Sequence, residues 1–313
     1  MATELLTHPY LLQTDDLTYD DIYKIFKKAR YFLDNYEPGT KFGDLKGLTV
    51  ALAFFEASTR TKLSFELAAK RLSADVFSFS AKTSSLSKGE SLIDTLRTIE
   101  AMSVQMYVVR HRNSGVPIFL QQNTDGVILN AGDGKHEHPT QALLDNFTLY
   151  RHFGDIKGLK ICIVGDIQHS RVARSNMTVM KTLGADVALC APGTLLPRNL
   201  DFWEVKLFDN IDDAVEWADV LLVLRLQRER MEAGLLPSMR EFSTYFGVNF
   251  EHFSHKPELV LMHPGPVNYG VELDYRLSSY PNVLIETQVT HGVFIRMALL
   301  SLLAETYRSG AVG

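Results

Sequence analysis

The chain has 313 residues, of which 46% are apolar and 22% are charged, and its formal net charge is −5. A single hydrophobic core rarely supports this length, so we expect two domains of roughly 150 residues each. The acidic balance, with no basic stretch to offset it, argues against nucleic acid as the main partner. An anionic ligand would therefore need a local cluster of cationic side chains.

Targeting and redox features indicate a cytoplasmic protein. The N-terminus lacks the basic start and apolar core of a signal peptide. The longest apolar run, residues 293–304, is interrupted by Arg296 and is too short to cross a membrane. Cys162 and Cys190 lie in separate apolar runs without metal or redox spacing, so we expect buried free thiols in a reducing compartment.

The first predicted elements are a helix, a strand and a second helix. Apolar side chains recur at helical spacing in residues 17–34, where Thr18 or Asp20 could cap the helix. Residues 48–53 are short, mostly apolar and partly β-branched, which indicates a buried strand. The apolar face predicted for the second helix consists of Leu63, Leu67, Ala68 and Leu72.

Three hydroxyls and a guanidinium stand between that strand and the second helix, at Ser58, Thr59, Arg60 and Thr61. A helix N-terminus offers unpaired N–H groups and the positive end of the helix dipole. The hydroxyls add donors, and the planar fork of Arg60 suits phosphate. The stretch therefore predicts a phosphoryl site. The alternative is ordinary capping by Ser58 or Thr59, which does not explain Arg60.

A polar loop follows the next predicted strand, residues 75–79. This loop, residues 80–89, holds Ser85 and Lys88 and has almost no apolar side chains. We expect it to be mobile ahead of a helix that starts near Glu90, and a plain solvated connection is the alternative interpretation.

Polar residues also lie at the ends of two more predicted strands. Residues 105–111 form a strand ending in Arg110, at the position where α/β folds bind ligands, although a surface arginine is common there. Residues 126–130 form the next strand, which leads to His136 and His138. These histidines and a nearby aspartate could suggest a metal, but the spacing is weak and no third ligand follows. Pro139 suits the first turn of a helix that runs to residue 150.

The second half begins with a βαβ unit after a passage at residues 151–160. The pattern is a strand at 161–166, a helix at 170–183 and a strand at 185–190. Neither a dinucleotide glycine motif nor a P-loop motif occurs, which argues against nicotinamide and nucleoside triphosphates. Arg171 and Arg174 oppose the helix dipole, a conflict that favours an anionic ligand, with a surface ion pair as the alternative.

The remaining elements again place polar groups after strands. A helix at 212–217 precedes a strand at 220–224, and Arg225 and Gln227 follow that strand. Residues 228–255 are charged and aromatic, which indicates a helix and a variable loop. A strand at 259–262 leads to the sequence His263-Pro264-Gly265-Pro266, whose prolines restrict the backbone so that its carbonyls can face a ligand. The final helix is predicted at about 289–307.

The motifs at 54–61, 85–90, 138–141, 165–176 and 263–266 together resemble the aspartate/ornithine carbamoyltransferase family over nearly the whole chain. Ala57 and Lys62 depart from the proline and arginine usual in that family, without removing a phosphate donor. The resemblance implies an α/β protein with two doubly wound domains, each a mostly parallel sheet flanked by helices. Residues 1–150 would bind carbamoyl phosphate, residues 151–288 would bind aspartate, and a C-terminal helix, residues 289–313, would return to the first domain.

The resemblance also implies roles for individual residues. The phosphate would be held by Ser58, Thr59, Arg60, Thr61, Ser85 and Lys88. The carbamoyl oxygen would be surrounded by Thr61, Arg110 and His138. The carbamoyl amino group would be bound by Gln141 and by the carbonyls around Pro264 and Gly265. The aspartate α-carboxylate would be bound by Arg171, and the β-carboxylate by Arg225, Gln227 and Lys88. The catalytic residues would be Arg60, Thr61, Lys88, Arg110 and His138.

The implied reaction transfers the carbamoyl group of carbamoyl phosphate to the amine of L-aspartate in de novo pyrimidine biosynthesis. No nucleophile triad, metal cage or cofactor motif is evident in the sequence, so positioning and oxyanion stabilisation would suffice without a metal or cofactor. The resemblance implies a homotrimer with shared active sites and leaves open whether a regulatory chain or a dihydroorotase partner binds. An ornithine-specific member is the nearest alternative, but Arg225 and Gln227 do not suit a cationic side chain. A catalytically silent assembly subunit is the other alternative.

Overall fold

The computed structural model describes residues 5–80, 91–198, 200, 203–226 and 238–310. The chain divides into two compact units, the first made of Met1–Phe147 and Thr290–Gly313 and the second of Thr148–Val289. Both boundaries lie inside helices, α5 (Pro139–Phe153) and α10 (Ile285–Arg308), rather than in loops. A boundary within a helix leaves no composition signal, which is why the sequence suggested a passage only from residue 151 onward.

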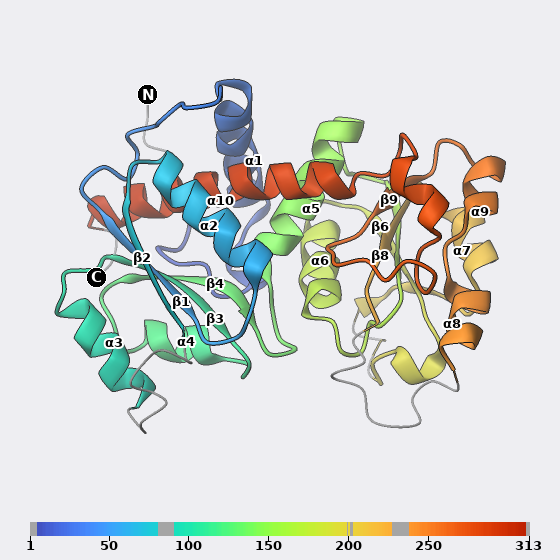
Figure 1. Ribbon diagram of the computed structural model, residues 1–313, viewed down its shortest axis with the longest axis horizontal. Coiled ribbons are helices and arrows are strands. Elements are labelled where there is room, and N and C mark those ends of the chain that lie inside the picture. The colour runs from blue at the N-terminus through green and yellow to red at the C-terminus, as the bar shows by residue number, and fades with distance from the viewer. Residues whose placement is uncertain (1–4, 81–90, 199, 201–202, 227–237, 311–313) are drawn as a thin grey trace. The chain divides into compact units, whose positions relative to one another are not determined.

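The first unit contains a four-stranded parallel sheet with the order β2-β1-β3-β4. Its strands are β1 (Thr49–Phe54), β2 (Asp75–Ser80), β3 (Met106–His111) and β4 (Val127–Asp133). Its helices, besides parts of α5 and α10, are α1 (Tyr19–Asp34), α2 (Thr59–Arg71), α3 (Leu92–Glu100) and α4 (Val116–Gln121). Helices α2 and α10 lie on one side of this sheet and α3 and α4 on the other (Figure 1).

The second unit contains a five-stranded parallel sheet with the order β7-β6-β5-β8-β9. Its strands are β5 (Lys160–Val164), β6 (Asp186–Cys190), β7 (Lys206–Phe208), β8 (Val220–Val223) and β9 (Val260–Met262). Its helices include α6 (Arg171–Thr182), α7 (Ile211–Trp217), α8 (Met239–Phe246) and α9 (Phe250–His255). Helix α6 covers one face of the sheet, and α7, α8 and α9 lie on the other (Figure 1). The expected fold class, two doubly wound parallel sheets with the C-terminal helix on the first domain, is confirmed.

The central strands form the core of each unit. Every residue of β4, β8 and β9 is buried, as expected for parallel strands covered on both faces. Both cysteines are buried and free, as predicted. Burial, together with Asp209 and Asp213, raises the pKa of Cys190 to about 12, and burial raises that of Cys162 well above its ordinary value. Neither thiol is therefore activated as a nucleophile.

Helix α10 is long and apolar enough to cross a membrane by length and composition, but 78% of its apolar window is buried inside the structure. It therefore serves as a packing helix of the core. It begins at Ile285, earlier than the predicted residue 289. The first turn contains Glu286, Thr287 and Gln288, so the apolar pattern does not reveal the true start.

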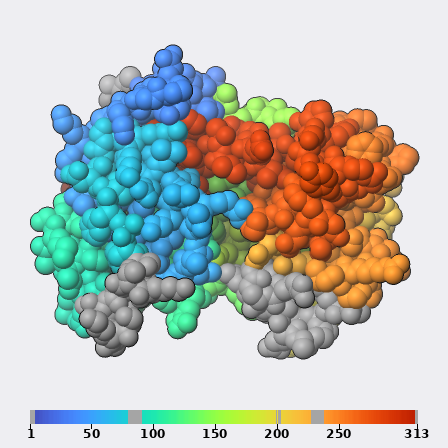
Figure 2. Space-filling view, in the orientation of Figure 1, coloured from blue at the N-terminus to red at the C-terminus, as the bar shows by residue number. Residues whose placement is uncertain are grey.

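The prediction of which residues form the apolar face of α2 is wrong in part. Leu63 is 58% exposed and Leu67 is 42% exposed. The buried face instead consists of Thr61, Phe65, Ala68, Ala69 and the C-cap residue Leu72. Because α2 lies at the surface of the first unit, only one stripe of it can meet the core (Figure 2). Phe65 and the two small alanines let that stripe approach the sheet more closely than the two leucines would.

Candidate functional site

The first set of predicted site residues flanks the switch point of the four-stranded sheet. The chain passes from β1 to β2 in one direction and from β3 to β4 in the other, so the order reverses between β1 and β3. Ligands of open α/β sheets bind outside the carboxyl ends of the strands at such a point. Phe54, the last residue of β1, is paired with Arg110 near the end of β3. Residues 58–61 therefore start α2 beside the strand end that carries Arg110.

The N-terminus of α2 is not capped in the ordinary way. Ser58 is the N-cap residue, with φ −160° and ψ 95°, and its side chain makes no capping hydrogen bond. By contrast, the Ser, Thr or Asn that caps α1, α3, α6, α7, α8 and α9 accepts a hydrogen bond from the backbone three residues on. The capping alternative for Ser58 is therefore not realised. Thr59 and Arg60 are exposed, whereas Thr61 is buried.

Arg110 is held in place by the strands on either side of it. Its side chain is almost completely buried, and its Nη1 donates a hydrogen bond of 3.0 Å to the carbonyl of Ala131 in β4. Its Nε lies 3.5 Å from Oε2 of Glu56, in the loop after β1. A guanidinium fixed from two sides is preorganised to stabilise negative charge on a ligand.

His138 and Gln141 lie at the start of α5, which follows β4. His138 is buried and directly precedes Pro139, the first residue of the helix, as predicted. Gln141 is half-buried, and its Nε2 donates a hydrogen bond of 2.9 Å to Oδ1 of Asp145. Since β4 is the neighbour of β3 in the sheet, both residues come from the same edge as Arg110.

The metal interpretation of the sequence concerns His136, His138 and a nearby aspartate, which is Asp133. The buried carboxylate of Asp133 accepts hydrogen bonds from the backbone N–H of Gly115 at 2.6 Å and from Nδ2 of Asn130 at 2.9 Å. Nδ1 of His136 lies 3.1 Å from Oδ2 of Asp133, the oxygen that also accepts from Gly115. Among the described residues, no group of three or more His, Cys, Asp or Glu side chains could hold a metal ion. Asp133 therefore acts as a structural acceptor for the loop after β4 and for the start of α4.

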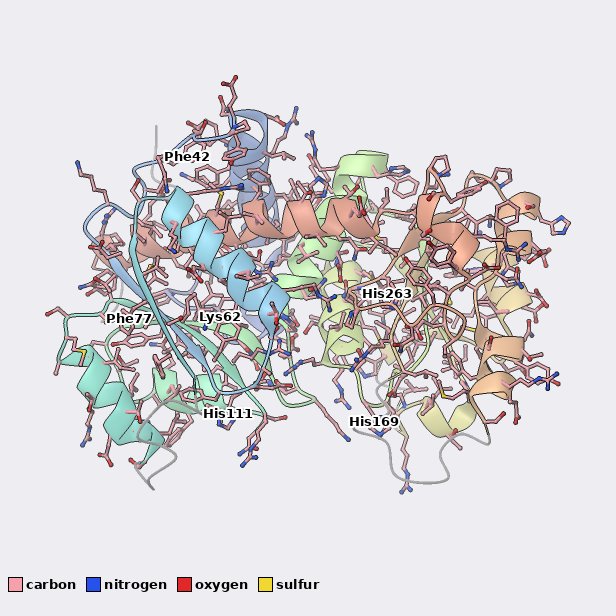
Figure 3. The ribbon with its side chains drawn as sticks, viewed as in Figure 1. Phe42, Lys62, Phe77, His111, His169 and His263 are labelled. Carbon is pink, nitrogen blue, oxygen red and sulfur yellow. The ribbon has the colours of Figure 1, made fainter. Side chains whose placement is uncertain are left out.

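An aromatic cluster lies at the carboxyl edge of this sheet. The ring of Phe55 meets those of Phe79 and His111, each with centroids 5.6 Å apart (His111 is labelled in Figure 3). Burial lowers the pKa of His111 below its ordinary value, although Glu56 and Asp133 oppose the shift. His111 is therefore neutral at physiological pH and adds no charge next to Arg110.

The second set of predicted residues flanks the switch point of the five-stranded sheet, which lies between β5 and β8. Gly165 follows β5 with a φ of 118°, and a Cβ there would lie 2.7 Å from the carbonyl oxygen of Leu224. Only glycine permits this approach, which brings the loop after β5 against the residues after β8. Arg171 begins α6 at the end of the first loop, and Arg225 directly follows Leu224.

The two arginines differ in exposure. Arg171 is 4% exposed, whereas Arg225 is half-buried. Ser170, the N-cap of α6, accepts a hydrogen bond of 3.1 Å from the N–H of Ala173. In the same loop, Asp166 and His169 are joined by a contact of 2.8 Å between Oδ1 and Nδ1 (His169 is labelled in Figure 3). The loop is thus internally fastened, and Arg171 extends from a rigid helix start.

The loop after β9 reaches the same edge. Leu222 of β8 is paired with Met262 of β9, so Pro264 and Gly265, which follow β9, leave the sheet beside the end of β8. Both residues are half-buried, and Gly265 has a φ of 67°. The loop therefore presents its backbone at the carboxyl edge of the sheet, next to the residues that lead to Arg225.

The comparisons with known proteins agree over almost the whole chain. The carbamoyl-phosphate-binding domain of the aspartate/ornithine carbamoyltransferases matches residues 10–151, and the aspartate/ornithine-binding domain of the same family matches residues 157–303. The chain belongs to the aspartate/ornithine carbamoyltransferase family. It is 50% identical over 308 residues to the aspartate carbamoyltransferase catalytic subunit of Maricaulis maris, covering 97% of this chain and 96% of that one. The aspartate carbamoyltransferase catalytic subunit of Carboxydothermus hydrogenoformans is 47% identical over 311 residues, which cover 98% of this chain and 100% of that one.

Solved structures of this carbamoyltransferase family share the fold. The aspartate transcarbamoylase of Trypanosoma cruzi, in complex with N-(phosphonacetyl)-L-aspartic acid, has a TM-score of 0.85 at 29% identity, covering 95% of this chain and 96% of that one. The catalytic subunit of the M. jannaschii aspartate transcarbamoylase has a TM-score of 0.84 at 33% identity, covering 95% of this chain and 98% of that one.

Some predicted residues lie outside the described part of the chain, and some contacts were not predicted. Ser85, Lys88 and Gln227 are among the residues that the structure does not describe.

Sequence reasoning missed Glu56 and Asp145, which contact Arg110 and Gln141 respectively. Gln141 and Asp145 have the i,i+4 spacing of a helical pair, a signal that could have been used. No local spacing relates Glu56 to Arg110.

Proposed function

We propose that this chain is the catalytic chain of an aspartate carbamoyltransferase. It would transfer the carbamoyl group of carbamoyl phosphate to the amine of L-aspartate, giving N-carbamoyl-L-aspartate and phosphate, in de novo pyrimidine biosynthesis. The observation that carries the proposal is the location of two cationic sets at the switch points of two parallel sheets. One set fits a phosphate and a developing oxyanion, and the other fits two carboxylates.

The phosphate would bind at the start of α2. The hydroxyl of Ser58 is not engaged in capping, and the first N–H groups of a helix point toward an anion. Arg60 would add a bidentate contact from an exposed position. Ser85 and Lys88 would complete this part of the site.

The carbamoyl carbon would be activated by Arg110. As the amine attacks, negative charge develops on the carbamoyl oxygen, and a buried, hydrogen-bonded guanidinium stabilises this charge without reorganising. Thr61 and His138, both buried at helix starts, would donate to the same oxygen. Gln141 and the carbonyls of Pro264 and Gly265 would hold the carbamoyl amino group. The phosphate leaves with a proton from the attacking amine.

Charge favours aspartate over ornithine as the acceptor. Arg171 and Arg225 follow neighbouring strands of the second sheet and would bind the α- and β-carboxylates, the latter with Gln227 and Lys88. A cationic ornithine side chain would meet a like charge at Arg225. Relatives of 47–50% identity over nearly the whole chain are named as the aspartate enzyme, which supports the same choice.

The proposal includes a cytoplasmic homotrimer in which the loop bearing Lys88 completes the site of a neighbouring subunit. The exposed apolar side chains of Leu63 and Leu67 on α2 and of Phe77 on β2 support a surface that is covered by another chain. No nucleic acid or membrane partner is proposed. Whether a regulatory chain or a dihydroorotase joins the assembly is a separate question for copurification.

The deciding experiment measures phosphate release and N-carbamoyl-L-aspartate formation from carbamoyl phosphate and L-aspartate. We expect turnover with L-aspartate and none above background with L-ornithine. Turnover with ornithine alone would make the chain an ornithine enzyme, and a folded chain inactive with both amino acids would be a silent homologue. Arg110→Met serves as the control variant and should lose activity while it still binds inorganic phosphate.

A further inference from the structure

A buried pair of side chains closes the loop that carries Pro264 and Gly265. This loop spans residues 264–271, so His263 directly precedes it and Glu272 directly follows it, and both side chains are 0% exposed. Nε2 of His263 lies 3.4 Å from Oε1 of Glu272. Burial of an acid and an imidazole is costly unless each is engaged by partners, so the pair needs an explanation.

Each member of the pair also binds a backbone N–H of the loop. The N–H of Gly265 donates a hydrogen bond of 2.8 Å to Nδ1 of His263, and the N–H of Asn268 donates one of 2.6 Å to Oε1 of Glu272. Because Nδ1 accepts, it carries no proton, and the ring proton of the neutral histidine is on Nε2, which faces Glu272. The loop is therefore fastened at both ends to two side chains that contact each other.

The two anchors are themselves fixed to the framework of the second unit. The backbone N–H of His263 donates a hydrogen bond of 2.9 Å to Oε1 of Gln288. The backbone carbonyl of Glu272 accepts one of 3.0 Å from the N–H of Val248. In contrast, the loop residues between the anchors are only partly buried or exposed. The positions of the Pro264 and Gly265 carbonyls thus depend on the buried pair rather than on packing of the loop itself.

We propose that Glu272 and His263 are positioning residues that hold the Pro264 and Gly265 carbonyls in place for the amino group of the carbamoyl donor. This inference rests on the proposed function, because it takes those carbonyls as the acceptors for that group. Such acceptors must be held within a few tenths of an ångström of their working position, and buried partners behind them provide this. Neither residue touches the substrate.

The test compares Glu272→Met and Glu272→Gln in the full-length enzyme. The glutamine keeps an acceptor oxygen for the N–H of Asn268, whereas the methionine leaves that N–H without this acceptor and removes the carboxylate that contacts the His263 ring. We expect Glu272→Met to raise the KM for carbamoyl phosphate about tenfold or more, and Glu272→Gln to stay within about threefold of wild type. Inhibition by inorganic phosphate, which lacks the carbamoyl group, should be unchanged in both variants. Glu251→Gln, an exposed acid of the same unit, is the matched control.

The outcomes separate this inference from the proposed function. An inactive wild type would overturn the proposed function itself. An active wild type whose Glu272→Met variant keeps its KM, or weakens phosphate inhibition equally, would overturn the positioning role. So would equal losses in the glutamine and methionine variants, because they would point to charge rather than to an acceptor. Should Glu272→Met fail to fold, His263→Asn decides: it keeps an acceptor near Gly265 but cannot reach Glu272, and an unchanged KM would then overturn the role.

Discussion

The arginine side chains at the strand ends and helix starts are buried to different extents, which suits different tasks. Arg110 and Arg171 are almost fully buried, so their charge sits in a low-dielectric environment where an anion gains most from it. Arg225 is half-buried after β8 and retains contact with solvent. A ligand carboxylate that binds Arg225 must therefore displace water. The affinity of the ligand then depends on how completely water is excluded from the charge pair.

Replacing Arg225 by alanine should raise the KM for aspartate strongly and leave the affinity for carbamoyl phosphate nearly unchanged. Removing one partner of a desolvated charge pair costs about 2–5 kcal/mol, and the residues of the proposed phosphate site at the start of α2 belong to the other unit. Steady-state kinetics with each substrate varied in turn measures both effects. Arg240→Ala, at an exposed position of the same unit, is the control. Equal losses for both substrates would contradict the assignment of Arg225 to the β-carboxylate.

Gly165 allows a test of how the second unit positions Arg225. Gly165→Ala would place a Cβ 2.7 Å from the Leu224 carbonyl, so Leu224 and the adjoining Arg225 must shift. Gly158→Ala also introduces a side chain at a positive φ, 74° against 118° at Gly165, but its Cβ meets nothing within 4 Å. Both variants should lose about 1–2 kcal/mol of unfolding free energy through the backbone conformation alone.

Only Gly165→Ala should also raise the KM for aspartate, by about tenfold or more. The reason is that displacing a substrate-binding group by about an ångström can lower the activity of an enzyme by about a hundredfold. Urea unfolding and kinetics on the two variants give both quantities. If the two alanines behave alike in both assays, the close approach of the two loops does not position Arg225.

At the scale of the element, helix α1 is fastened at its start by a carboxylate. Asp21 accepts hydrogen bonds from the N–H of Thr7 at 3.1 Å and from the N–H and hydroxyl of Thr18 at 3.1 Å and 2.7 Å. Burial alone would raise the pKa of Asp21, but these hydrogen bonds outweigh it and lower the pKa below its ordinary value of 3.8. The ionised carboxylate thus stabilises the folded state.

The sign of this shift predicts an acid sensitivity. A carboxyl group whose pKa is depressed by folding contributes stability that is present above its unfolded pKa and is lost as the pH falls through the folded value. Asp21→Asn should therefore destabilise the protein at pH 7, and the difference from wild type should shrink as the pH falls below 3.8. Thermal unfolding between pH 7 and pH 3 measures this, with Asp20→Asn, an exposed neighbour, as the control. A difference that does not change with pH would show that the effect is steric.

At the scale of the whole molecule, the proposed trimer with shared sites predicts complementation between two inactive variants. Lys88→Ala and Arg60→Ala would damage opposite halves of one composite site. Refolding an even mixture should restore about one quarter of wild-type activity, because each site draws two chains at random (about ½ × ½). Native mass spectrometry confirms that mixed trimers have formed. Mixed trimers without recovered activity would show that Lys88 serves its own chain.

Local sequence patterns determined most of the elements and the order of the site residues. Short apolar runs, helical periodicity and turn residues act over a few positions, so they located β1, β3, β8 and the starts of α5 and α6. They also placed Arg110 and Arg225 at strand ends. The exposed Leu63 and Leu67 on α2 mark where such reasoning fails, because periodicity reveals an apolar residue but not which stripe meets the core.

Only the tertiary structure decided which distant residues become partners. Arg296 interrupts an apolar run in the sequence, yet it is buried and donates a hydrogen bond of 2.7 Å to Ser64, 232 residues earlier in the chain. Burial lowers the pKa of Arg296 to about 10, a cost that Asp145 partly offsets. The contact of Gly165 with Leu224 likewise follows from strand order, because these residues follow the neighbouring strands β5 and β8. Strand order depends on long-range packing, which no local pattern encodes, so the sequence by itself determined the chemical groups and the fold determined their neighbours.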